Sequence, residues 1–145
     1  MINVRFPAPA FNIKKEGEKR YIFDGLRKTW LRLTEEEWVR QNFVAYLIKT
    51  ANYPAAFIAV EKEIFFNDLK KRFDVLVYNQ QHQPWMLIEC KAPHVTLSDA
   101  VLQQVLRYNV SVPVKYLVIT NGTTTVGWEK SGERLNLISS LPSFE

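Results

Sequence analysis

Two strand-forming segments separated by a polar loop constrain this chain more than any other feature of its sequence. The segments, 72–78 and 85–91, are rich in β-branched and aromatic residues, and the loop between them, 79–84, ends in proline. This pattern predicts an antiparallel β-hairpin. If the centre of this six-residue loop lies between Gln81 and His82, Asp74 is expected directly across from Glu89.

The predicted register gathers charge on one face of the hairpin. Side chains alternate between the two faces of a strand, so Asp74, Glu89 and Lys91 are expected to share a face. The opposite face is predicted to be core because its side chains are apolar or nearly so: Phe73, Val75, Val77, Met86, Ile88 and Cys90. A Glu-x-Lys on a strand is most often solvated, but the dense apolar sequence here indicates a covered sheet, where charges need a functional reason.

The chemistry of this charged face favours a metal ion. Two opposed carboxylates repel one another unless a cation offsets their charge. Hard divalent cations such as Mg²⁺ take oxygen ligands, commonly one or two carboxylates together with water and phosphate. Lys91 could then orient or deprotonate the attacking water, or offset charge in the transition state. These groups meet the requirements of metal-assisted phosphodiester hydrolysis.

A helix is predicted from Thr34 to about Thr50, ahead of the hairpin. Thr34 is expected to cap it, and Glu37 to complete a capping box. Glu36 falls in the middle of the apolar stripe of this helix and is expected to reach inward. The other members of the stripe are Val39, Phe43, Tyr46 and Leu47.

A second helix is predicted from Ser98 to about Asn109. Gln104 and Tyr108 are i,i+4 neighbours on its apolar stripe, so they could hold a phosphate of the ligand or a water molecule. A Gln–Tyr pair that satisfies hydrogen bonds in the core explains the same pattern equally well.

The order of the predicted elements indicates the fold class. Further strands are predicted at 57–65, 115–120 and 124–128. Helices and strands in this order predict a layered α/β or α+β domain, and we expect the α/β class with a central mixed β-sheet flanked by α-helices. A chain of 145 residues fits a single domain, 1–145, in which 34–128 form the core. Residues 1–33 are expected to form a basic N-terminal arm, irregular or folded as a small hairpin, that packs on the core.

The arm is basic because residues 1–33 hold eight Lys or Arg against three Asp or Glu. These cations could contact phosphates or could form an ordinary solvated surface. Cys90 is the only cysteine, and strand alternation aims its thiol into the core rather than toward catalysis with His94. No segment approaches the length of a membrane-spanning helix, so we expect a cytoplasmic protein without a membrane partner.

The order of these motifs resembles the PD-(D/E)xK nuclease superfamily, and more specifically the N-terminal nuclease domain of type I restriction enzyme R subunits. The resemblance covers about 34–128 and rests on the stretches 36–41, 71–79, 87–93, 104–108 and 120–122. It implies a restriction-endonuclease-like core that hydrolyses DNA with Mg²⁺ (or Mn²⁺) as its cofactor. It also implies a homodimer or partner subunits as further partners.

The resemblance assigns a role to each matching residue. The catalytic positions are matched by Asp74, Glu89, Lys91 and Glu36. The metal would be held by Asp74, Glu89 and the backbone carbonyl of Cys90. An accessory pair near the substrate is matched by Gln104 and Tyr108.

Two departures from the family pattern bear on these expectations. Phe73 stands where the motif has proline, which is the loosest position of the pattern. The Gly-x-x-x-x-Gly-Lys-Ser/Thr loop of an ATP-driven translocase does not occur, so this chain would not translocate DNA by itself. The main alternative is a non-catalytic nucleic-acid-binding module that retains the nuclease fold, and a structural or protein-interaction role comes third.

Overall fold

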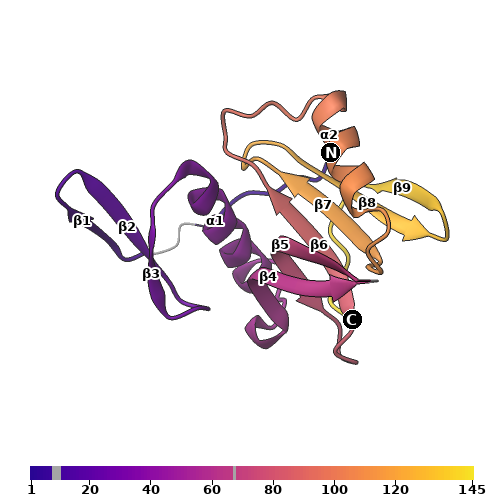
Figure 1. Cartoon of the computed structure of the whole chain (residues 1–145), viewed down its shortest axis with the longest axis horizontal. Coiled ribbons are helices and arrows are strands. Elements are labelled where there is room, and N and C mark those ends of the chain that lie inside the picture. The colour runs from indigo at the N-terminus through magenta and orange to yellow at the C-terminus, as the bar shows by residue number, and fades with distance from the viewer. Residues whose placement is uncertain (8–10, 67) are drawn as a thin grey trace.

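Two β-sheets and two α-helices make up the part of the chain that the computed structural model describes, which is residues 1–7, 11–66 and 68–145 (Figure 1). The elements follow one another as β1 (Ile13–Glu16), β2 (Lys19–Asp24), β3 (Thr29–Arg32), α1 (Glu35–Lys49), a 3₁₀ turn (Ala55–Phe57), β4 (Ile58–Phe66), β5 (Leu69–Tyr78), β6 (Pro84–Cys90), α2 (Asp99–Asn109), β7 (Tyr116–Thr120), β8 (Thr125–Ser131) and β9 (Arg134–Ile138).

The larger sheet confirms the predicted mixed topology. Its strands lie in the order β4-β5-β6-β7-β8-β9, and every neighbouring pair is antiparallel except β6 and β7. Parallel strands need a crossover connection, and α2 supplies it between β6 and β7. The α/β class with a central sheet flanked by helices is therefore correct.

The sequence predicted that the core ends at Trp128, but the larger sheet continues beyond this residue. Strand β8 continues to Ser131, and a turn at Gly132, whose φ is +63°, leads into β9. Strand β9 escaped prediction because it is an edge strand whose residues are largely exposed, so its sequence lacks a run of buried apolar residues.

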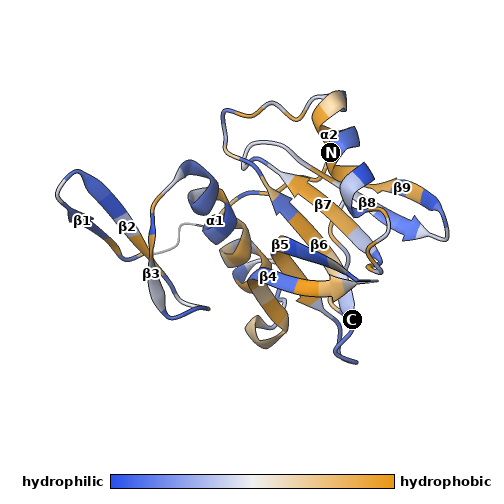
Figure 2. Ribbon diagram, in the orientation of Figure 1, coloured by the Kyte–Doolittle hydropathy of each residue, from blue (hydrophilic) through white to orange (hydrophobic). Residues whose placement is uncertain are grey.

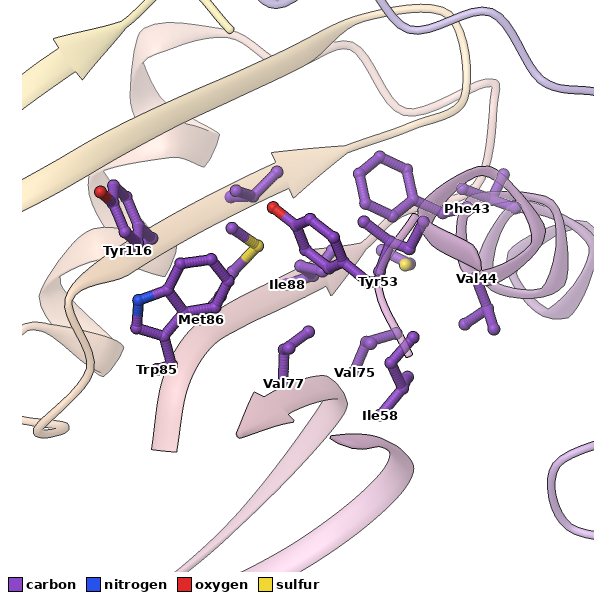
Figure 3. Close-up of a cluster of buried hydrophobic side chains, with 14 residues drawn as sticks. Phe43, Val44, Tyr53, Ile58, Val75, Val77, Trp85, Met86, Ile88 and Tyr116 are labelled. Carbon is purple, nitrogen blue, oxygen red and sulfur yellow. The ribbon is translucent and has the colours of Figure 1, made fainter. Parts of the chain in front are cut away.

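The two faces of the larger sheet bury separate clusters of apolar side chains. Figure 3 shows the cluster under α1, where Phe43 and Val44 of the helix lie over Val75, Val77 and Ile88 of the sheet. The cluster on the other face lies under α2 and includes Leu76, Leu87, Leu106, Leu117 and Ile119. Alternation along β5 and β6 thus feeds both clusters, as the period of a strand requires.

Phe73 is a correction to the predicted core face. The side chains of Val75, Val77, Met86, Ile88 and Cys90 do share the α1 face, but Phe73 packs with Leu76 and Leu87 on the α2 face. The change of side occurs next to an irregularity in the neighbouring strand. Glu61 of β4, which lies between the partners of Phe73 and Val75, has a φ of +52°.

The N-terminal segment is more regular than the irregular arm or small hairpin that was predicted. Strands β1, β2 and β3 form a three-stranded antiparallel sheet that projects from the body at the left of Figure 1. Figure 2 shows that β1 and much of β2 are hydrophilic, whereas β6 and β7 are largely hydrophobic. The proline-rich start of the arm also predicts a turn at Pro9, but this residue lies outside the described residues.

Candidate active site

The hairpin register that the sequence predicted is present in the structure. Val75 pairs with Ile88 and Val77 with Met86, and the register shifts only beyond Val77, near the loop. One step further along the same register, the Asp74 carboxylate accepts a hydrogen bond at 2.8 Å from the backbone N–H of Cys90. Asp74 is therefore held against the end of β6, beside Glu89.

Glu89 shares a side-chain hydrogen bond with Asp74, and its pKa is raised to about 8. Burial is the largest cause, followed by the charge of Asp74 and the hydrogen bond to it, while the Lys91 ammonium acts in the opposite direction. The raised pKa favours one proton on the Asp74–Glu89 pair at neutral pH.

Lys91 follows directly after β6 and completes the Glu-x-Lys motif. Its backbone N–H donates to the carbonyl of Thr120 at 2.8 Å, which ties the end of β6 to the end of β7. The pKa values of Glu89 and Glu36 are both raised, and the positive charge of the Lys91 ammonium partly opposes this rise. The structure thus brings together the carboxylates and the lysine that the sequence predicted to share a face.

Glu36 lies at the rim of this group rather than beneath the helix. Glu36 is exposed in the first turn of α1, so the prediction that its side chain reaches inward toward the core is wrong. Partial burial and the charge of Asp74 nevertheless raise the pKa of Glu36. Glu36 is therefore near enough to Asp74 and Lys91 to feel their charges, but it is open to solvent.

Arg40 is a member of the site that sequence reasoning missed. Its guanidinium is buried, and Nη1 lies 3.3 Å from the Asp74 carboxylate and 2.6 Å from that of Glu61. Burial alone would lower the pKa of Arg40, but the hydrogen bond from Arg40 to Glu37 and the charges of Glu37, Glu61 and Asp74 raise it above its usual value. Arg40 is therefore a permanent positive charge beside Asp74.

Glu37 connects Arg40 to the N-terminal sheet instead of completing the predicted capping box. Thr34 does cap α1, since its hydroxyl accepts from the N–H of Glu37 at 3.0 Å. The Glu37 carboxylate is buried and accepts from Arg27, from Arg40 at 2.5 Å and from Gln41. Arg27 in turn bonds to Asp24 at the end of β2. The spacing of Glu37, Arg40 and Gln41 at i, i+3 and i+4 on one face of α1 was the signal that could have indicated these contacts.

Gln104 and Tyr108 do not lie on the buried side of α2, which corrects the prediction made for that helix. Both residues are exposed, and the helix buries Leu106 and Asn109 instead. Among the described residues, neither side chain hydrogen-bonds to Asp74, Glu89 or Lys91. Tyr108 is joined to β5 through Lys71, whose ammonium donates to the Tyr108 carbonyl at 2.5 Å and lies 4.6 Å from its ring centre.

Cys90 occupies the position that was predicted for it. Its thiol is fully buried in the cluster under α1, and burial raises its pKa well above the usual value. His94 lies on the surface, where its ring is 2.6 Å from the carboxylate of Glu35. A Cys–His nucleophile is thus excluded by position.

The donor set at the end of β6 suits a hard cation. The carboxylates of Asp74 and Glu89, together with the Cys90 carbonyl, offer oxygen only, which is the chemistry that Mg²⁺ prefers. In the described ranges, no group of three or more His, Cys, Asp and Glu side chains is arranged to hold a metal ion. A magnesium ion commonly takes one or two carboxylates and completes its shell with water and phosphate, so Asp74 and Glu89 are the side chains that could hold one here.

A comparison with known protein families shows that this site lies within the region matched by one family model. The family model for the type I restriction enzyme R protein N terminus matches residues 35–142. The match spans well over half of the chain and includes Glu36, Asp74, Glu89 and Lys91, whereas β1–β3 lie outside it. No curated protein matches the chain. Over the residues that the structure describes, neither helix is long and apolar enough to cross a membrane.

Proposed function

Because the chain belongs to the family of type I restriction enzyme R protein N termini, we propose that it is a nuclease domain of the PD-(D/E)xK type that hydrolyses DNA phosphodiester bonds with a divalent metal ion. The observation that carries this proposal is the contact between Asp74 and Glu89, with the Lys91 ammonium acting on the same pair. A pKa that is strongly raised by burial and by a specific charged neighbour marks a candidate functional site.

The metal-binding residues in this proposal are Asp74 and Glu89, with the Cys90 carbonyl as a third oxygen donor. A bound Mg²⁺ or Mn²⁺ would supply charge neutralisation at the scissile phosphate. Arg40 and the Cys90 N–H each hold one oxygen of the Asp74 carboxylate, at 3.3 and 2.8 Å, and thereby fix its orientation. Fixed ligands lower the reorganisation that the reaction requires.

Two further side chains act on water and phosphate. Lys91 orients the attacking water and offsets the negative charge that grows as the P–O bond to the leaving oxygen breaks. Glu36, whose pKa is raised by burial and by Asp74, accepts the proton that the water loses. Its exposed position at the rim of the site gives that proton a path to solvent.

Metal binding is tested by thermal unfolding during titration with Mg²⁺ or Mn²⁺. A ligand that binds the folded state raises the unfolding temperature, and the wild-type protein is expected to show this shift. Asp74→Ala should abolish the shift, whereas Glu63→Ala, which removes an exposed acid from β4, should retain it. An equal shift in all three proteins would contradict a metal site at Asp74.

Catalysis is tested by incubating the protein with labelled single-stranded and duplex DNA in the presence of Mg²⁺ or Mn²⁺. Lys91→Ala is expected to lower cleavage by roughly a hundredfold or more, in the range typical for loss of one acid–base or electrostatic group. Lys62→Ala removes an exposed cation from β4 and should leave cleavage unchanged. Cleavage that survives Lys91→Ala would place the activity elsewhere.

A non-catalytic DNA-binding module is the second candidate function, and Arg40 is the observation that favours it. Arg40 lies within ion-pair distance of both Asp74 and Glu61, so it neutralises part of the acidic charge without any metal. For such a module, DNA binding would be measurable while the unfolding temperature did not respond to Mg²⁺ and no cleavage occurred. The two assays above therefore separate the candidates.

A further inference from the structure

One face of the N-terminal sheet combines aromatic rings with cations. Strand pairing aligns Lys14, Tyr21 and Arg32 across β1, β2 and β3, and it aligns Phe23 with Trp30. Because side chains alternate along each strand, these residues and Lys19 share one face of the sheet. We call this the aromatic–basic face, and it consists of Lys14, Glu16, Lys19, Tyr21, Phe23, Trp30 and Arg32.

The opposite face of the same sheet has a different character. Ile13, Ile22 and Leu31 are paired across the strands on that side, and Ile22 is fully buried. Lys15 and Arg20 are paired with one another on the same side and are both exposed. The aromatic–basic face thus carries three cations and one acid, Glu16, whereas the opposite face carries two cations and the buried Asp24. The aromatic rings lie on the first face only.

Contacts within the aromatic–basic face hold its rings in place and leave one of them accessible. The Phe23 and Trp30 rings meet edge to face with centroids 5.4 Å apart, and Trp30 remains 39% exposed. The Lys14 ammonium lies 4.5 Å from the Trp30 ring centre and 6.0 Å from that of Tyr21. It also forms a surface ion pair with Glu16 at 3.1 Å. Exposed cation–π and surface ion pairs are weak, so Lys14 can exchange either partner for a phosphate.

We propose that the aromatic–basic face binds single-stranded DNA. A base can stack on the exposed Trp30 ring, and Lys14, Lys19 and Arg32 can contact the phosphates on either side of it. The bases of a duplex are stacked on one another and cannot reach such a ring, so the face favours unpaired strands. This inference rests on the proposed function, because it names the form of DNA that the domain engages. The face lies outside the matched family region and adds to it a binding element of its own.

The charge of the face is tested with two double variants of the full chain that remove the same charge. Lys14→Ala/Arg32→Ala changes the aromatic–basic face, and Lys15→Ala/Arg20→Ala changes the opposite face. Binding of a labelled single-stranded oligonucleotide is measured in EDTA at several salt concentrations. Loss of two phosphate contacts should reduce the slope of log K against log salt by about 1.4 in the first variant and leave it near the wild-type value in the second. Equal effects in the two variants would overturn the proposal.

The stacking contribution is tested with Trp30→Leu, which keeps an apolar side chain but removes the flat ring. This variant should weaken binding to the single strand on the order of 5- to 150-fold and leave binding to a duplex of the same sequence unchanged. Unchanged binding to the single strand, in a variant whose thermal unfolding matches the wild type, would overturn the proposal. Binding in EDTA needs no cleavage, so this result is independent of the Mg²⁺-dependent assay with Lys91→Ala.

Discussion

At the scale of single residues, Glu89 defines the electrostatic state of the site. Its pKa of about 8 means that the folded protein retains a proton that the unfolded chain, with an ordinary carboxyl value of 4.5, releases. The folded state is then stabilised most below pH 4.5, and this contribution is lost as the pH rises through about 8. Its size is on the order of a few kcal/mol.

The Glu89→Gln variant tests this assignment in metal-free protein. The amide still donates to Asp74 but does not titrate, so the free energy of unfolding of the variant relative to wild type should increase from pH 5 to pH 8. Chemical denaturation in EDTA at several pH values measures the difference. Glu63→Gln, an exposed acid of β4, serves as a control whose difference from wild type should stay flat. A flat difference for Glu89→Gln would mean that Glu89 is ionised at neutral pH.

At the scale of elements, the first turn of α1 joins the two sheets through buried charge. Glu37 binds Arg40, which contacts Asp74 of β5, and it binds Arg27, which follows β2. Glu35, two residues earlier, carries the same charge but pairs with His94 at the surface. A buried pair that loses one partner leaves an uncompensated charge, whereas a surface pair contributes little.

Substitutions in this turn should therefore differ strongly although they change the same charge. Glu37→Gln is expected to destabilise the protein by about 3–5 kcal/mol because Arg27 and Arg40 both lose the buried carboxylate that they share. Glu35→Gln should change stability by no more than about 1 kcal/mol. Urea denaturation of the two variants measures both values. Similar losses in both would indicate that Glu37 acts only through the dipole of α1.

At the scale of the whole molecule, the C-terminal segment closes the cluster under α1. Phe144 packs against the rings of Phe57, Tyr53 and Trp85, at centroid distances between 5.2 and 5.8 Å. The Tyr53 hydroxyl also donates to the carbonyl of Pro142 at 2.6 Å. The sequence predicted a core that ends at Trp128, but these contacts show that residues well beyond it pack against the core.

Removal of the Phe144 ring tests how much this closure contributes. Phe144→Ala should destabilise the protein by about 2–4 kcal/mol, since the ring is partly buried and leaves a cavity among aromatic neighbours. Phe65→Ala removes the same ring from β4, where it is 78% exposed, and should cost no more than about 0.5 kcal/mol. Thermal unfolding of both variants gives the comparison, and equal losses would contradict a closing role for Phe144.

The assembly state belongs to the same scale. A homodimer or partner subunits remain a prediction from the family resemblance, because only one copy of the chain is described. The edge strands β4 and β9 each present unpaired backbone groups, and the side chains of Phe65 and Leu137 are exposed on them.

The local pattern of the sequence was enough to predict both helices, strands β4 to β8 and the register between β5 and β6, but not β9 or the N-terminal sheet. Period-2 alternation and the turn residues act over a few neighbours, so they placed Asp74 beside Glu89 and the Cys90 thiol in the core. Only the tertiary structure decided which charges meet across long separations. The Arg40 contacts with Glu61 and Asp74, the Glu37 link to Arg27 and the outward position of Tyr108 depend on how helices are oriented on the sheet, and that orientation is set by the packing of both apolar clusters at once.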